Sequence, residues 1–392
     1  MIYLDHHATT PVDPRVLKAM LPFFSEKFGN PSSRTHRPGW DASDAVERAR
    51  KQVAALIGAS AREVVFTSGA TEANNLAIAG VAAAAVADRR HIVTVATEHK
   101  AVLDPCRALE AQGWQVTVLP VAPSGIVDLA VVEQAVTPST ALVSVMLANN
   151  EIGVVQPVAA IARLARQHGA LVHTDAVQAL GKLPMELASL DVDLASFSAH
   201  KLYGPKGVGA LYVKRGADKR LRAQVRGGGQ ERGLRGGTLN VPGIVGFGAA
   251  CEVAAQEMPA ETPRLSALRD RLWQLLRDGV DGVTMNGAPA PRLPGNLNVS
   301  FDGIDGEALL LALSDVAVSS GAACTSAEPS HVLTALGLST RRALASLRFG
   351  LGRATTAAEI DDAARHVGAV VSQLRGQSLA RVPAAASAGG AA

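Results

Sequence analysis

The sequence has few cysteines and few aromatic residues. Only Cys106, Cys251 and Cys324 occur in 392 residues, and none of them belongs to a CxxC pair. Scattered thiols of this kind exclude a disulfide framework and are typical of a reducing cytoplasm. The histidines do not stand at ligand spacing from them, so we expect no bound metal. Aromatic residues make up only 4% of the chain, which leaves Ala and Val to supply much of the apolar core.

The sequence also lacks a charge imbalance and a long hydrophobic run. Its 38 basic and 35 acidic residues give a formal net charge of +3, which does not favour DNA or a membrane surface as a partner. The most apolar stretch, residues 81–87, is Ala-rich, ends before Asp88 and is too short to cross a membrane. The N-terminus has no basic start followed by an apolar run, so we expect no secretion signal and a cytoplasmic location.

Short β-branched runs alternate with Ala- and Leu-rich stretches from about residue 45 to residue 215. Strand runs with little polar alternation, separated by helices, predict a mostly parallel sheet that is covered on both faces. In such an α/β domain, ligands bind at the carboxyl ends of the strands. The predicted strands are 63–67, 91–95, 116–119, 141–145, 171–174 and 194–197, and the clearest helices are 41–57, 72–87 and 158–168.

The pattern changes after residue 213. Residues 214–243 are rich in Gly and Arg, and a helical stretch over 246–278 and a strand at 296–300 follow. We therefore predict two domains and a tail. The large α/β domain covers 15–258, a smaller α+β domain combines 1–14 with 259–376, and 377–392 has too little apolar bulk to fold and should be disordered.

Three strand ends carry groups that suit one ligand. Residues 67–69 lead from a strand into a helix near Ala70–Thr71, where free N–H groups favour a phosphate, although an ordinary helix start would look similar. Asp175 follows an apolar strand and could pair with a pyridinium nitrogen or cap a helix. Lys201 lies between apolar stretches, and a desolvated lysine can form a Schiff base, whereas a surface lysine is the plainer reading. Together, these three features are what pyridoxal phosphate requires.

Seven segments resemble, in order, the landmarks of the cysteine desulfurases. This family belongs to the class V aminotransferase group of fold-type I enzymes that depend on pyridoxal phosphate. The resemblance is to the NifS/IscS-like branch and runs from residue 4 to residue 353. The segments are FTSGATEANNLAI, EHKAVLD, NNEIGVVQP, HTDAVQALGKLP, SFSAHKLYGPKGVGALYV, GGGQERGLRGGTLN and SSGAACTSAEPSHVL.

The resemblance implies a role for each matched residue. Lys201 would carry the cofactor covalently, His99 would stack on the cofactor ring and move protons, and Cys324 would be the nucleophile. Arg348 would bind the carboxylate of the substrate, helped by Asn30 and Asn150. The implied cofactor contacts also include Ala70, Thr71, Asn150, Asp175, Gln178, Ser198, His200 and Thr238, the last of them from the second subunit of a homodimer, while Ala8 and Thr9 match positions that line the pocket.

The reaction implied by the resemblance is removal of sulfur from L-cysteine, which gives L-alanine and a persulfide on Cys324. The sulfur would then pass to an acceptor protein, either an iron–sulfur scaffold or a tRNA-thiolation relay. Cys106 and Cys251 lie in helical, apolar contexts and should be inert. The segment after Cys324 is shorter than is usual in the family, which makes its reach toward an acceptor a separate question.

Three alternatives remain at this point. A selenocysteine lyase or a class V transaminase would share the cofactor site, and the transaminase would not need Cys324. The third alternative is a role in binding tRNA or a protein partner through residues 214–235, where eight basic residues accompany only Asp218 and Glu231. Such a run is more often a solvated face.

Overall fold

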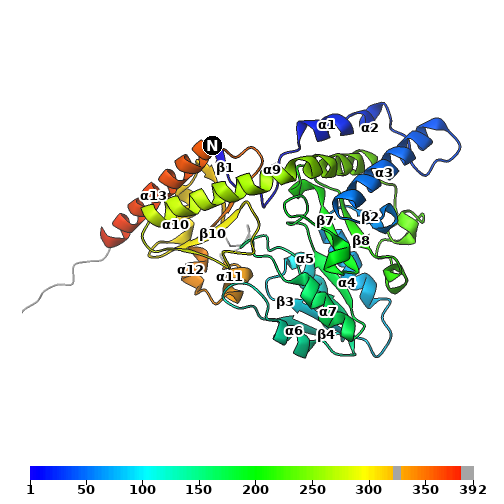
Figure 1. Cartoon of the computed structure of the whole chain (residues 1–392), viewed down its shortest axis with the longest axis horizontal. Helices are drawn as coiled ribbons and strands as arrows, with labels where there is room; N and C mark the ends of the chain where they lie inside the picture. The colour runs from blue at the N-terminus through cyan, green and yellow to red at the C-terminus, as the bar shows by residue number, and fades with distance from the viewer. Residues whose placement is uncertain (321–327, 381–392) are drawn as a thin grey trace, which may run out of the picture.

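A seven-stranded sheet forms the centre of the larger half of the molecule. The computed structural model describes residues 1–320 and 328–380 (Figure 1). The order across the sheet is β2–β8–β7–β6–β5–β3–β4. The pairs from β7 to β4 are parallel, and only β8 runs antiparallel to its neighbours β2 and β7, which confirms a mostly parallel sheet. The strands are β2 (Val64–Thr67), β3 (His91–Val95), β4 (Gln115–Leu119), β5 (Thr140–Ser144), β6 (Leu171–Asp175), β7 (Leu194–Ser198) and β8 (Gly209–Val213).

Helices cover both faces of this sheet. One face packs against α3 (Arg37–Leu56), α7 (Val158–Gln167) and the first half of α9 (Val241–Gly279). The other face packs against α4 (Ala70–Ala82) and α5 (Lys100–Glu110). Every residue of β3, β5, β6, β7 and β8 is buried, which explains why these runs show no polar alternation. The shorter helices on this half are α1 (Pro14–Met20), α2 (Pro22–Ser25), α6 (Leu129–Ala135) and α8 (Leu187–Leu190).

The predicted elements occur, with differences at some of their ends, such as α3, which begins at Arg37 and not at residue 41, and with further elements that were not predicted. The predicted strands and helices all occur, but α4 ends at Ala82, before the predicted limit of 87. The antiparallel strand β8 was not predicted, since its run follows a Gly- and Lys-rich turn that reads as a loop. Helix α9 begins at Val241 and not at residue 246, because the Asn240 side chain accepts a hydrogen bond from the Gly243 N–H and starts the helix earlier.

The second half contains a four-stranded antiparallel sheet in the order β12–β13–β10–β9. A separate apolar core fills the space between this sheet and its helices. The N-terminal strand β1 (Ile2–Tyr3) pairs in parallel with β11 (Val316–Ala317), so the first residues of the chain belong to this half. Its elements are β9 (Val283–Met285), β10 (Asn296–Phe301), β12 (Ser319–Ser320), β13 (Ser346–Gly350), α10 (Gly306–Ala312), α11 (His331–Ala335), α12 (Thr340–Leu344) and α13 (Ala357–Ala380).

Helix α9 connects the two halves and extends across the molecule in Figure 1. Its first part, up to Ala254, packs in the core of the large sheet, and its second part, from Leu265, packs in the core of the small sheet. Our predicted domain boundary at residue 258 lies in the stretch between them. At the other end of the chain, α13 continues to Ala380, so residues 377–380 are helical and not part of a tail, and the remaining residues of the predicted tail lie outside the described part.

The Gly- and Arg-rich segment 226–237 is attached to the large sheet by one buried carboxylate. Glu231 and Arg232, in the short 3-10 helix η4 (Glu231–Gly233), both have positive φ angles, 46° and 58°. The Glu231 carboxylate accepts hydrogen bonds from both terminal nitrogens of Arg50, each at 2.7 Å, and from the Phe66 N–H of edge strand β2 at 2.7 Å. These bonds hold a backbone conformation that non-glycine residues seldom adopt.

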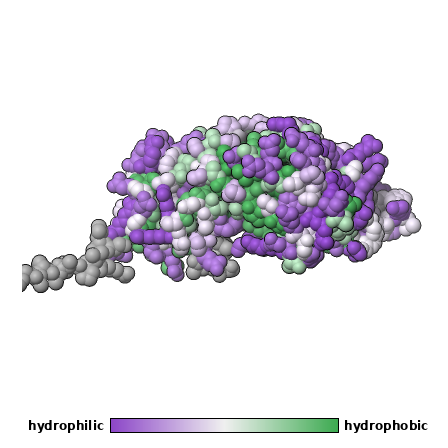
Figure 2. All heavy atoms as spheres, turned by 90° about the horizontal axis from the view of Figure 1, so that it is seen from below, coloured by the Kyte–Doolittle hydropathy of each residue, from purple (hydrophilic) through white to green (hydrophobic). Residues whose placement is uncertain are grey.

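On the surface, polar side chains surround an apolar area near the middle of the face shown in Figure 2. That view is from below Figure 1, where the edge strand β4 lies. Within the described residues, no helix is long and apolar enough to cross a membrane.

Candidate active site

The carboxyl end of β6 places Asp175 in a buried position that other side chains define. Its Oδ2 accepts a hydrogen bond from Asn74 Nδ2 of helix α4 at 2.8 Å, and its Oδ1 accepts one from the Val177 N–H at 3.1 Å. Asp175 is only 5% exposed and Asn74 is fully buried. The carboxylate therefore has a fixed orientation, with lone pairs left for a further donor.

The N-terminus of helix α4 provides an anion site beside Asp175. Gly69 precedes the helix with φ of 155° and supplies no side-chain cap. Among the described residues, no hydrogen-bond partner is found for the N–H groups of Ala70 and Thr71, so they and the helix dipole can serve a phosphate. Gly209 of β8 approaches this turn closely, because a Cβ on it would come within 2.8 Å of the Gly69 backbone.

A carboxylate also lies in the first turn of α4, where it would repel a phosphate. Glu72 is paired with Arg235, whose Nε lies 2.8 Å from Glu72 Oε1. The Ser68 N–H donates to the same carboxylate at 2.8 Å. Arg235 therefore offsets the negative charge of Glu72, and it also ties the Gly-rich segment to the anion site.

Strand β7 ends at Ser198, and the 3-10 helix η2 (Ala199–Lys201) follows it directly. Ser198 is buried opposite Gly209. His200 Nδ1 lies 3.1 Å from Thr9 Oγ1, and burial together with the nearby charge of Lys201 lowers the pKa of His200 to about 4. The imidazole is therefore neutral at physiological pH and can act as a hydrogen-bond partner without adding charge.

Lys201 donates from Nζ to the backbone oxygens of His7 and Ala8, both at 2.6 Å. Burial, with the charge of Arg348, lowers the pKa of Lys201 to about 8, while Asp5 and Asp175 act in the opposite direction. An amine with such a pKa is partly neutral near physiological pH. It can therefore act as a nucleophile or a base.

His99 is the N-cap of helix α5 and lies at the end of the sheet where the carboxyl ends of the parallel strands meet. Its Nδ1 accepts a hydrogen bond from the Ala101 N–H at 3.0 Å, so the proton of the neutral ring is on Nε2. Burial lowers the pKa of His99, the charges of Lys201 and His331 lower it further, and Asp175 raises it. These charge effects also show that His99, Asp175 and Lys201 share one region of the molecule.

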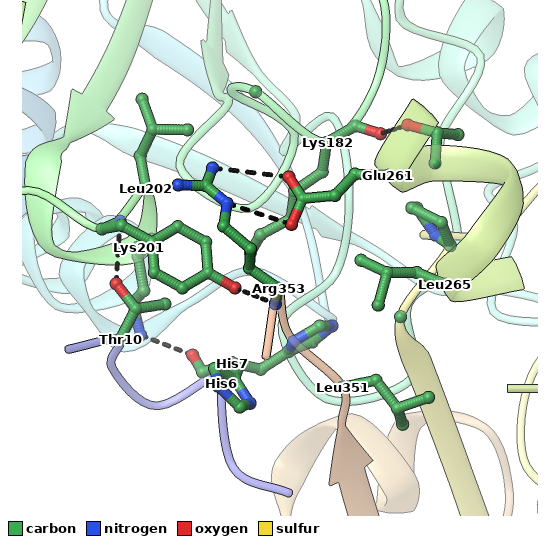
Figure 3. A pocket seen from close by; sticks show the side chains of 15 residues that line it. His6, His7, Thr10, Lys182, Lys201, Leu202, Glu261, Leu265, Leu351 and Arg353 are labelled. Carbon is green, nitrogen blue, oxygen red and sulfur yellow. Dashed lines mark hydrogen bonds and ion pairs between the residues drawn. The ribbon is translucent and has the colours of Figure 1, made fainter. Parts of the chain in front are cut away.

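Gln178 links this region to the N-terminal segment. Its Nε2 donates to the His7 backbone oxygen at 3.0 Å, and its Oε1 accepts from Lys182 Nζ at 2.9 Å. His7, Lys182 and Lys201 also line a cavity of about 20 Å³ between the two halves of the chain, shown in Figure 3. A cavity of this size has room for about one water molecule.

Arg348 comes from β13 of the small sheet and approaches from the other side. One terminal nitrogen donates to Asp5 Oδ1 at 2.8 Å and to Ser319 Oγ at 2.9 Å, and the other donates to the Asn150 backbone oxygen at 3.1 Å. Its Nε is buried without a partner among the described residues. The guanidinium is thus held in place and retains a donor for an anionic ligand.

Two of the sequence-derived site residues that the structure describes, Asn30 and Thr238, are not brought into this group. Asn30 is exposed in the connection between α2 and α3 and accepts a hydrogen bond from the Ser32 N–H. Thr238 is exposed just after the Gly-rich segment. Cys324 lies outside the described residues. The sequence reasoning missed Asp5, Asn74 and Lys182. Asn74 and Lys182 had a usable signal, because they lie within the quoted motifs FTSGATEANNLAI and HTDAVQALGKLP.

The family model of the class-V aminotransferases matches residues 2–362 of the chain. The chain belongs to this family and, within it, to the cysteine desulfurases. It is 57% identical over 379 residues to cysteine desulfurase IscS of Anaeromyxobacter dehalogenans strain 2CP-C, an alignment that covers 96% of this chain and 94% of the relative. It is 55% identical over 362 residues to human cysteine desulfurase, and that alignment covers 92% of this chain and 79% of the human protein.

Solved structures agree with this family assignment. A structure described as a NifS-like protein superposes with a TM-score of 0.89 at 41% identity, and the match covers 95% of this chain and 100% of that one. The fold-type I architecture implied by the sequence is therefore confirmed.

Cysteine desulfurases of class V depend on pyridoxal phosphate, and the residues of this chain fit that group at three points. The N-terminus of α4 has unpartnered N–H groups for the phosphate. Asp175 has free lone pairs for the ring nitrogen, and Lys201 has a lowered pKa suited to the aldehyde. Among the described residues, no cluster of His, Cys, Asp or Glu could hold a metal ion.

Proposed function

We propose that this chain removes sulfur from L-cysteine and holds it as a persulfide on Cys324 before transfer to an acceptor. One observation carries the proposal. The chain aligns with proteins named cysteine desulfurase over nearly their whole length, with 57% identity to one of them. The geometry supports it, because Lys201 and Asp175 lie at neighbouring strand ends and Arg348 extends toward them from the small sheet.

The substrate would be held by its two charged ends. Arg348 would bind the carboxylate through Nε and its remaining N–H groups, since Asp5, Ser319 and the Asn150 oxygen already fix the guanidinium plane. When bound, pyridoxal phosphate supplies an electron sink for negative charge that develops at the substrate Cα. The residues that would hold it are Ala70, Thr71, Asn150, Asp175, Gln178, Ser198, His200 and Lys201, with Thr238 from a second subunit.

Lys201 and His99 would move the protons. Lys201 would hold the cofactor covalently and, as a free amine, would take the Cα proton of the bound substrate. The backbone oxygens of His7 and Ala8 would stabilise the resulting ammonium, because both accept hydrogen bonds from Nζ. His99 stays neutral, and with its Nδ1 engaged by Ala101 it has only the Nε2 side to offer.

Sulfur transfer would then occur at Cys324. Its thiolate would form an S–S bond to the substrate sulfur as the carbon–sulfur bond breaks, and the electron pair of that bond would stay with the carbon fragment. Protonation of the fragment gives alanine. L-cysteine and the Cys324 thiol thus become L-alanine and a persulfide, with no external oxidant.

Partner, assembly and location are also part of the proposal. The acceptor would be an iron–sulfur scaffold or a tRNA-thiolation relay, in keeping with the IscS name of the bacterial relative. The active unit would be a homodimer, because Thr238 is exposed after a segment anchored by Glu231 and can serve a second subunit. A cytoplasmic location is consistent with Cys106 and Cys251, which are buried free thiols.

The decisive experiment measures alanine release from L-cysteine, with and without a reductant, for wild type and Cys324→Ala. The variant should lose more than about 100-fold in turnover, because a covalent nucleophile is removed. It should still exchange the Cα proton with solvent, since Lys201 and Arg348 are untouched. Mass spectrometry should find the extra sulfur on the peptide that contains Cys324.

Cys106→Ala and Cys251→Ala are the matched controls. Both thiols are buried in helices, and burial raises the pKa of Cys106 to about 12 and that of Cys251 also well above its usual value. Both variants should stay near wild-type turnover. Undiminished turnover in Cys324→Ala would return the chain to the transaminase alternative. A fully active monomer in sedimentation would refute the dimer.

A further inference from the structure

Lys182 is a second lysine at the site, and the proposed chemistry does not use it. It follows β6 by seven residues and lines the same cavity as Lys201, together with His7 and Glu261, as Figure 3 shows. Its Nζ donates to Gln178 Oε1 at 2.9 Å. Among the described residues, no ion pair includes Lys182, so a carboxylate partner does not explain its presence.

The location of Lys182 is unfavourable for a cation. Burial, with the charges of Lys201 and Arg348, lowers its pKa to about 7, and Glu261 acts in the other direction. Glu261 is itself engaged by Arg353 Nε at 3.2 Å. A methionine of similar length would fill the same space without this penalty. Packing alone therefore does not explain why a lysine, with its polar amine, stands at this position.

The hydrogen bonds of Gln178 identify that use. Lys182 Nζ donates to the amide oxygen of Gln178, which therefore faces it. The His7 oxygen can only accept, so Nε2 must face the opposite way. Gln178 is only 3% exposed, which leaves its amide few other partners. One N–H of Nε2 is used by His7, and the second is left for the reaction centre.

We propose that Lys182 is a positioning residue for the reaction centre, acting through Gln178. By holding Oε1, it fixes the plane of the amide and keeps the second N–H of Nε2 directed toward the ring oxygen of the cofactor. The same amide donates to the His7 oxygen, which also accepts a hydrogen bond from Lys201 Nζ. The Gln178 side chain therefore helps to position both the cofactor ring and Lys201. This inference rests on the proposed role of Gln178.

The test compares Lys182→Met with wild type, first for retention of pyridoxal phosphate by apoprotein titration. The variant keeps the length of the side chain but cannot donate, so Gln178 Oε1 loses its partner. We expect about 10-fold weaker retention, the loss typical of one charge-assisted hydrogen bond. The visible absorption band of the loaded protein should also shift, because the donor to the ring oxygen is no longer fixed. Lys182→Arg retains donors to Gln178 Oε1, and it should recover most of the retention.

The double-mutant cycle with Gln178→Ala decides whether Lys182 acts through Gln178. In that background, Lys182→Met should change retention by less than about 2-fold, because the amide is already gone. Lys214→Met is the matched control for loss of a lysine charge, since Lys214 pairs with Asp191 away from this cavity. It should leave retention unchanged.

Three results would overturn the inference: unchanged retention and absorption in Lys182→Met, an undiminished loss in the Gln178→Ala background, or no recovery in Lys182→Arg. Circular dichroism and thermal unfolding of each apoprotein show whether a variant has merely failed to fold. Failure of the proposed function would look different, because wild type itself would then neither bind pyridoxal phosphate nor release alanine from L-cysteine.

Discussion

Replacing Glu231 by Gln should destabilise the chain more than any exposed substitution. The carboxylate is the shared acceptor of Arg50 and the Phe66 N–H, and its side chain is 1% exposed against 5% for Arg50. Burial disfavours the charge of Arg50, yet the bonds with Glu231 outweigh that effect and the pKa of Arg50 is raised. The amide in Glu231→Gln would leave Arg50 as a buried cation without its buried counter-charge, paired only with the exposed carboxylate of Glu47 at 3.0 Å.

The expected loss in the free energy of unfolding is about 3–5 kcal/mol, which is typical of breaking a buried ion pair by removing one partner. It should be measured by urea unfolding of the apoprotein, followed by circular dichroism. Removing both partners, in Arg50→Met with Glu231→Leu, should recover part of the loss. A deficit of about 1–3 kcal/mol should remain, because the Phe66 N–H then has no acceptor.

The exposed pair Arg271–Asp361 provides the matched control. Asp361→Asn should give no measurable change, since exposed pairs contribute little. Glu231→Gln should also weaken retention of pyridoxal phosphate, because it releases the segment 226–237, which positions Thr238 for its proposed contact. An unchanged unfolding midpoint in Glu231→Gln would refute the reasoning that this carboxylate holds the segment against the sheet.

Two further predictions concern the substrate and pH. Arg348→Lys should raise KM for L-cysteine by roughly 10- to 100-fold, because an ammonium cannot reproduce the fork that the guanidinium presents; steady-state kinetics that match wild type would contradict this. Burial lowers the pKa of His173, which lies between Ser144 Oγ and Ser196 Oγ, to about 3. Because this folded-state pKa is below the unfolded value of about 6.5, the stability from His173 is complete above pH 6.5 and is lost as pH falls toward 3. His173→Gln should therefore reduce the slope of unfolding free energy between pH 6.5 and 4, and an unaltered slope would show that another group causes it.

Local sequence determined the regular elements and the chemical groups at the strand ends. The β-branched runs became buried strands because a parallel sheet covered on both faces requires apolar side chains in both directions. Asp175 and Lys201 were identifiable because a polar residue at or shortly after the end of such a run lies at the carboxyl ends of the strands, where ligands bind. The family motifs then allowed roles to be proposed for residues such as Gln178 and Arg348.

Only the tertiary structure decided how distant segments complete the site. The N-terminal segment brings the oxygens of His7 and Ala8 to Lys201, which lies 194 and 193 positions away along the chain, respectively. Glu231 reads as one acid within a basic, Gly-rich loop, yet it is buried against Arg50, 181 positions away. Lys182 lies within a family motif, but only the structure shows that it is buried at the cavity and donates to Gln178. Composition and periodicity report what each residue prefers locally, whereas these contacts depend on the packing of two separate cores along α9, which no local pattern encodes.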